Sequence, residues 1–143
     1  MPPSGKTARV LEHDLALWEA KRSLRRLANL RKAHVHRGFF KETDDVFLGV
    51  TTPQIRQLVR QFQDLPLAAL HVLMKSHILD ERSLAHAILV RKFERGDASA
   101  QERIFHFYIR NRQCIRSWDG VDDSAPYIAG RYLLNRKQGQ PTP

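Results

Sequence analysis

One stretch of the chain combines an aromatic ring and a carboxylate at a spacing that could do chemistry. It reads Ser117-Trp118-Asp119-Gly120-Val121-Asp122 and continues through Pro126 to Tyr127. In a helix, Trp118 and Asp122 stand at positions i and i+4, on one face and one turn apart. An indole face beside a carboxylate can stabilise a cationic transition state. The alternative is that Trp118 belongs to the core and Asp122 is a surface or capping residue.

The charge of the chain favours a polyanionic partner. Its 143 residues include 24 Lys and Arg against 15 Asp and Glu, which gives a net charge of +9. No acidic residue occurs from Ala20 through Lys41, a segment with helical spacing. Such a one-signed face is typical of a phosphate-facing flank, or of a helix that binds calmodulin or a membrane surface. A basic surface that is merely well solvated is the other interpretation.

Several classes of site are absent from the sequence. The single cysteine, Cys114, excludes an internal disulfide and a cysteine-rich metal site. The seven histidines form no HExxH pattern, and the glycines form no phosphate-binding loop. No apolar run is long enough to span a membrane, and the first residues do not form a secretory signal. We therefore expect a cytosolic monomer without a metal or cofactor.

The pattern of apolar residues predicts helices throughout. The segment Val46–Val50 has strand character, but no partner strand is found, so we interpret it as an apolar connector. Thr51 and Gln54 have the spacing of a capping box, and Asp80 is a candidate N-cap. The predicted helices include 9–35, one beginning at Thr51, 81–95, and 117–136 with a bend at Pro126.

The predicted fold class is all-α. We expect one helical domain over residues 9–137, with a flexible lead at 1–8 and a disordered tail at 138–143. Consecutive amphipathic helices with short links favour stacked antiparallel pairs, as in a HEAT-like α-solenoid. No clean repeat is visible in the sequence, so a compact helical bundle is the alternative.

The sequence resembles the DNA alkylation repair proteins, a family of HEAT-like-repeat DNA glycosylases. The resemblance covers roughly residues 35 to 135 and depends on motifs that are specific in combination. These are Asp45-Val46-Phe47-Leu48-Gly49-Val50 followed by Thr52-Pro53 and Arg56, the pair Glu81-Arg82, and Ser117 through Asp122 with Pro126 and Gly130.

The resemblance implies an enzyme that acts on double-stranded DNA carrying N3- or N7-alkylated purines. By analogy with the family, Trp118 would lie beside the deoxyribose and Asp122 would be the catalytic carboxylate. A cationic alkylpurine leaves readily, so the carboxylate is needed for the oxocarbenium-like sugar. Position and charge make four arginines candidates for DNA contacts: Arg56, Arg112, Arg116 and Arg131.

The chain also departs from the family pattern. Members continue with further helices beyond the point that matches Pro143, so we expect a C-terminally truncated form. One alternative function is therefore a DNA-binding helical-repeat module without chemistry. A further alternative is a helical scaffold for an acidic protein.

Overall fold

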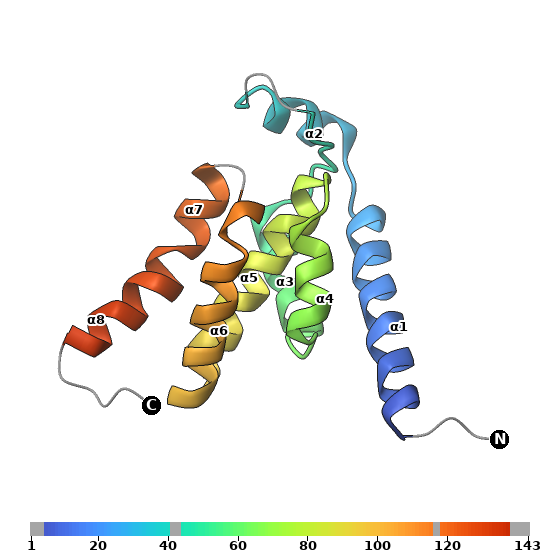
Figure 1. The fold of residues 1–143 in the computed structure, drawn as a ribbon. Helices are drawn as coiled ribbons and strands as arrows, with labels where there is room; N and C mark the ends of the chain where they lie inside the picture. The colour runs from blue at the N-terminus through green and yellow to red at the C-terminus, as the bar shows by residue number, and fades with distance from the viewer. Residues whose placement is uncertain (1–4, 41–43, 116–117, 138–143) are drawn as a thin grey trace.

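Helices make up the regular structure in the computed structural model, which describes residues 5–40, 44–115 and 118–137 (Figure 1). Among these residues the only β-type pairing is an isolated bridge between Val46 and Ile78. The predicted all-α class is therefore confirmed. The helices are α1 (Gly5–Arg26), α2 (Leu30–Arg37), α3 (Thr52–Phe62), α4 (Leu67–Met74), α5 (Leu79–Arg95), α6 (Ala98–Arg110), the 3₁₀ turn η1 (Arg112–Cys114), α7 (Trp118–Ser124), the π-helical segment η2 (Pro126–Gly130) and α8 (Arg131–Lys137).

The central element is α5, which contacts α3, α4, α6 and α7. Its predicted apolar stripe is buried, with Leu84, Ala85, Ile88, Leu89 and Phe93 in the core. Helices α3 and α4 both contact α5, and α6 and α7 contact it as well (Figure 1). This arrangement fits both a helical solenoid and a bundle.

The predicted continuous helix over residues 9–35 is wrong, because the chain breaks after Arg26 and begins a new helix at Leu30. Asn29 lies between the two helices in an extended conformation, and its side chain accepts a hydrogen bond from the Lys32 amide. Its own amide donates to the Leu48 carbonyl at 2.7 Å. The break is therefore stabilised by a distant segment of the chain, which periodicity does not reveal.

The connector between α2 and α3 fits closely against α2. Gly49 has a φ of 80°, and a Cβ atom there would lie 2.3 Å from the Asn29 oxygen. Only glycine is compatible with both this backbone conformation and this close approach. After the connector, Thr51 and Gln54 form the predicted capping box at the start of α3.

The prediction that Asp80 is the N-cap of α5 is wrong. The helix begins at Leu79, two residues before the predicted start at Glu81, and Ile78 occupies the cap position. The Asp80 carboxylate is 2% exposed and accepts hydrogen bonds from the amides of Leu48 and Val50, at 2.7 and 3.0 Å. It thereby satisfies two donors of a connector whose β-type pairing, among the described residues, is limited to the bridge between Val46 and Ile78. Asp80 therefore fixes the connector to the central helix.

The next two residues of α5 are also charged and buried. Glu81 forms an ion pair with Lys21 of α1 at 3.4 Å. Arg82 makes a two-pronged contact with the Asp45 carboxylate, at 2.7 and 3.0 Å, and donates to the Ser76 carbonyl. The start of α5 thus holds α1 and the connector through three consecutive side chains.

The last predicted helix, expected over residues 117–136 with a bend at Pro126, is divided in the structure into α7, η2 and α8. Residues 126–130 form a π-helical segment between α7 and α8. The buried Ser124 hydroxyl of α7 lies 3.0 Å from the Tyr108 hydroxyl of α6, and this hydrogen bond joins the two helices. The same hydroxyl donates to the Gly120 carbonyl within α7. Gly120 also packs on His86 of α5, where a Cβ atom would lie 2.9 Å from the imidazole Cε1. Helix α7 is therefore held by contacts with two neighbouring helices.

Removal of the Asp80 carboxylate is expected to destabilise the protein strongly. The substitution Asp80→Ala leaves two amides of the connector without acceptors, which costs on the order of 3 kcal/mol in the free energy of unfolding. Urea denaturation measures the change. A control is Asp97→Ala at the exposed N-cap of α6, expected to cost about 1 kcal/mol. Equal losses in the two variants would show that the connector does not depend on Asp80.

His86 is expected to make stability depend on pH. Burial, with a smaller contribution from the charge of Arg82, lowers the pKa of His86 from 6.5 to about 4. The unfolded chain therefore takes up a proton at a higher pH than the native protein does. The contribution of neutral His86 to the free energy of unfolding is therefore fully present above pH 6.5. It is lost as the pH drops towards about 4, and the free energy of unfolding falls by up to about 3 kcal/mol.

Denaturation of wild type and His86→Leu across this pH range tests the effect. The variant lacks the titrating group, so its free energy of unfolding should fall less steeply with decreasing pH. The same slope in both proteins would contradict the assignment.

Candidate nucleic-acid interface

An open groove of about 660 Å³ lies between α2, α3, α5 and the α7–η2 segment. Three arginines line it: Arg56 and Arg60, on successive turns of α3, and Arg91 on α5. The carboxylates of Asp80, Glu94 and Asp123 line it as well. The three arginines and the three carboxylates cancel in formal charge. The groove is thus mixed in charge, without a formal excess of either sign among the described residues.

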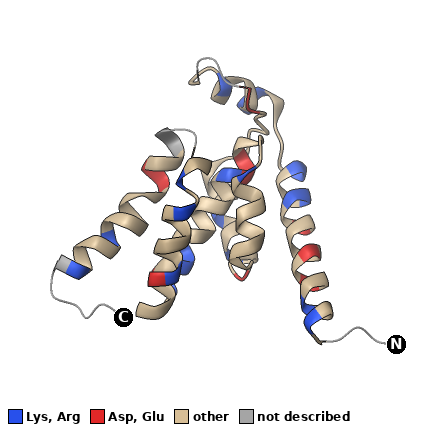
Figure 2. Cartoon of the chain, viewed as in Figure 1, with Lys and Arg blue, Asp and Glu red and all other residues tan. Residues whose placement is uncertain are grey.

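The basic residues of the chain are not gathered at this groove. Figure 2 shows Lys and Arg spread over α1, α5, α6 and other parts of the ribbon. On α1, the Arg22 guanidinium lies 5.0 Å from the centre of the Trp18 ring, a cation–π contact on an exposed face. The net charge of +9 is therefore a property of the whole surface.

The two residues predicted to do chemistry both belong to α7. Trp118 is its first residue, but the Trp118 side chain lies outside the described part of the structure. Asp122 is exposed to solvent and does not line the groove, whereas its neighbour Asp123 does. Whether the indole and the Asp122 carboxylate share one face stays a prediction.

Asp123 and Tyr127 are groove residues that the sequence reasoning missed. Both line the groove, from α7 and η2, and the Tyr127 side chain is 45% exposed. Their spacing of four residues repeats the spacing of Trp118 and Asp122. The sequence therefore contains the same i, i+4 spacing twice, five residues apart, and spacing alone does not tell which pair lines the groove.

The four arginines predicted to contact DNA have different positions. Arg56 lines the groove. Arg112 is exposed and donates to the Ile109 carbonyl at the end of α6, and Arg131 is exposed at the start of α8. Arg116 lies outside the described residues. The sequence reasoning missed Arg60 and Arg91, although Arg60 follows Arg56 by one helical turn.

The residues that the structure describes contain no group of His, Cys, Asp and Glu side chains arranged to hold a metal ion. None of their helices combines the length and the apolar character that crossing a membrane requires.

Comparison with known proteins identifies the family. Residues 20–142 match the family model described as "DNA alkylation repair enzyme", a range that contains every residue of the groove. A search of curated proteins and a search of solved structures each gave no match. Because the matched range covers most of the chain, the protein belongs to the DNA alkylation repair enzyme family.

Proposed function

We propose that the protein is a DNA glycosylase that hydrolyses the N-glycosidic bond of N3- or N7-alkylated purines in double-stranded DNA. The observation that carries the proposal is the family match, together with an arginine-lined groove that the Asp122-containing helix borders. The arginines of α3 and α5 suit contacts with phosphates, and α7 contributes the Asp123 carboxylate to the groove lining, next to Asp122 in the sequence. No metal or cofactor is required for this chemistry.

In the proposed mechanism, Asp122 stabilises positive charge on the sugar. An alkylated purine carries a positive charge and leaves as a neutral base, so the barrier lies mainly in forming the oxocarbenium-like deoxyribose. The Asp122 carboxylate would stabilise this cation and orient the attacking water. The indole of Trp118, one helical turn earlier, would form the wall beside the sugar.

The phosphate contacts proposed for the DNA begin at Arg56. This side chain projects from α3 into the groove, with Arg60 and Arg91 on the same surface. Arg112, Arg116 and Arg131 are proposed to extend the contacts along the C-terminal part of the chain. Arg112 and Arg116 precede α7 in the sequence and Arg131 follows it, which is the basis for proposing them.

A DNA-binding module without chemistry is the second candidate function. The exposure of Asp122 favours it, because a hydrated carboxylate exerts a weaker field on a nearby cation. In this case binding to duplex DNA would persist without release of a base. Replacement of Asp122 by Asn would then leave binding unchanged or strengthen it, since a negative charge near the phosphates is removed.

The substitution Asp122→Asn is expected to abolish most base release. Wild type should free 3-methyl- or 7-methylpurines from methylated duplex DNA, and loss of the carboxylate should lower the rate roughly 100-fold or more. Chromatography of the released bases measures the rate under single-turnover conditions. Asp123→Asn is the matched control, since it removes the same charge one residue away.

Two results would contradict this assignment. Absence of release by wild type at high enzyme concentration would remove the glycosylase proposal and leave the binding module. Loss of activity in Asp123→Asn with retention in Asp122→Asn would show that the wrong carboxylate was chosen.

The substitution Arg56→Gln is expected to weaken binding to duplex DNA uniformly across sequences. One phosphate contact fewer lowers the slope of log affinity against log salt concentration by about one. Fluorescence anisotropy over a series of salt concentrations measures this slope. Arg9→Gln, at an exposed position of α1, is the control with the same change of charge. Equal effects of the two variants would mean that only the total charge attracts DNA.

A further inference from the structure

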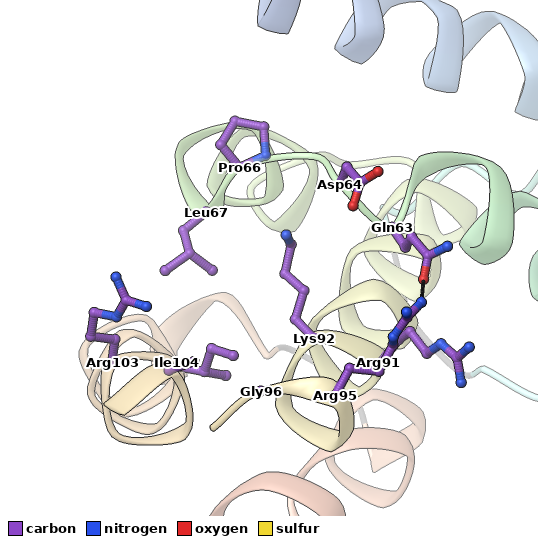
Figure 3. A pocket seen from close by; sticks show the side chains of 11 residues that line it. Gln63, Asp64, Pro66, Leu67, Arg91, Lys92, Arg95, Gly96, Arg103 and Ile104 are labelled. Atoms are coloured by element: carbon purple, nitrogen blue, oxygen red, sulfur yellow. Dashed lines mark hydrogen bonds between the residues drawn. The ribbon is translucent and has the colours of Figure 1, made fainter. Parts of the chain in front are cut away.

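A second pocket lies apart from α7, where the α3–α4 turn, the last turns of α5 and the first half of α6 meet (Figure 3). Its volume is about 510 Å³, within the range of small-molecule sites. The proposed glycosylase chemistry does not use this pocket. Arg91 is the one residue that lines both the pocket and the groove.

The pocket concentrates positive charge from two helices. Arg91, Lys92 and Arg95 come from α5, and Arg103 comes from α6. Among the described residues of the lining, the only carboxylate is that of Asp64. Within the described part of the chain, none of these four cations has a carboxylate within ion-pairing distance. Four cations around one cavity repel one another, so an anion between them would lower the energy of the site.

The cationic side chains reach the pocket from different sides. In Figure 3 the Lys92 ammonium extends into the middle of the pocket, while Arg103 stands on the α6 side and Arg95 on the α5 side. Arg95 donates one hydrogen bond to the Gln63 Oε1 atom at 2.7 Å, which holds its guanidinium in place and leaves further N–H donors available. Planar guanidinium groups with several donors match the oxygens of a phosphate.

Lys92 is the least hydrated of these cations. Burial lowers the pKa of its ammonium below the usual 10.5, and the Asp64 carboxylate opposes this shift only in part. A partly desolvated ammonium without an ion pair is stabilised when an anion arrives. Next to it, Leu67 and Ile104 supply an apolar surface on which the organic part of a ligand can rest.

We propose that this pocket binds a phosphate monoester, with the phosphate held by Lys92, Arg95 and Arg103. The monoester is either a small phosphorylated molecule such as a mononucleotide or the terminal phosphate of a DNA strand. An interior phosphodiester fits less well, because it carries a single negative charge and must enter with chain on both sides. The binding is independent of the proposed glycosylase activity.

Calorimetric titration of the full chain with pyrophosphate and with deoxyadenosine monophosphate tests the proposal. Saturable binding with one site per chain is expected for both probes. The substitution Arg103→Gln, at an exposed position that should not disturb folding, should weaken binding about tenfold because it removes a charged donor pair. Lys92→Met, which keeps the apolar stem, should weaken binding similarly.

Arg9→Gln, at an exposed position of α1 far from both sites in the sequence, is the control with the same change of charge and should leave the affinity for pyrophosphate unchanged. Equal weakening by Arg9→Gln and Arg103→Gln would overturn the proposal, since it would reveal attraction by overall charge. Absence of saturable binding at millimolar probe concentrations would overturn it as well.

A pair of single-stranded oligonucleotides, with and without a terminal phosphate, distinguishes the two sources of the ligand. Tighter binding of the phosphorylated strand, lost in Arg103→Gln, supports a DNA end. Equal binding of the two strands, with the mononucleotide still bound in an Arg103-dependent manner, supports a small phosphorylated molecule. Both proteins with substitutions in the pocket should retain release of alkylated bases, which separates this test from that of the proposed function.

Discussion

The first turn of α5 holds the N-terminal half of the molecule together through buried charges. Asp80 binds two amides of the connector, Glu81 binds Lys21 of α1, and Arg82 binds Asp45. Removing charges from water is costly, and these contacts are stabilising only because each charged group has a partner. The constraint is therefore geometric as well as energetic: the connector and α1 must both reach α5 at the same turn.

This constraint also shapes the groove. The connector leads directly into α3, whose capping box begins at Thr51, just after the segment held by Asp80. Arg56 and Arg60 follow within the next turns of α3. The position of the groove's arginines thus depends on Asp80. Its carboxylate lines the groove, but it accepts hydrogen bonds from backbone amides of the connector. A residue that looks functional by position can therefore be structural by its contacts.

Helix α5 separates two sites of different electrostatic character. Near its end, Arg91 and Glu94 line the groove, while Lys92 and Arg95 line the second pocket. Neighbouring residues face different sides because a helix turns about 100° per residue. The groove balances its charges, whereas the pocket collects cations with little compensation. The excess of positive charge in the second pocket therefore lies away from α7.

The sequence by itself determined the all-α fold class and the features that depend on residues close together in the chain. The all-α class, the capping box of Thr51 and Gln54 and the motifs of the family depend on local patterns, and each was confirmed by the structure or by the family match. Such features depend on residues only a few positions apart, and their physical causes act within one turn of helix.

Only the tertiary structure decided the features that join distant segments. The break at Asn29 depends on Leu48, and the role of Asp80 depends on amides about thirty residues earlier in the chain. The face of α7 that meets the groove, which favours Asp123 over Asp122, depends on how α7 packs against His86 and Tyr108. Periodicity identifies which residues share a face, but the direction of that face is set by the neighbours that pack against the helix.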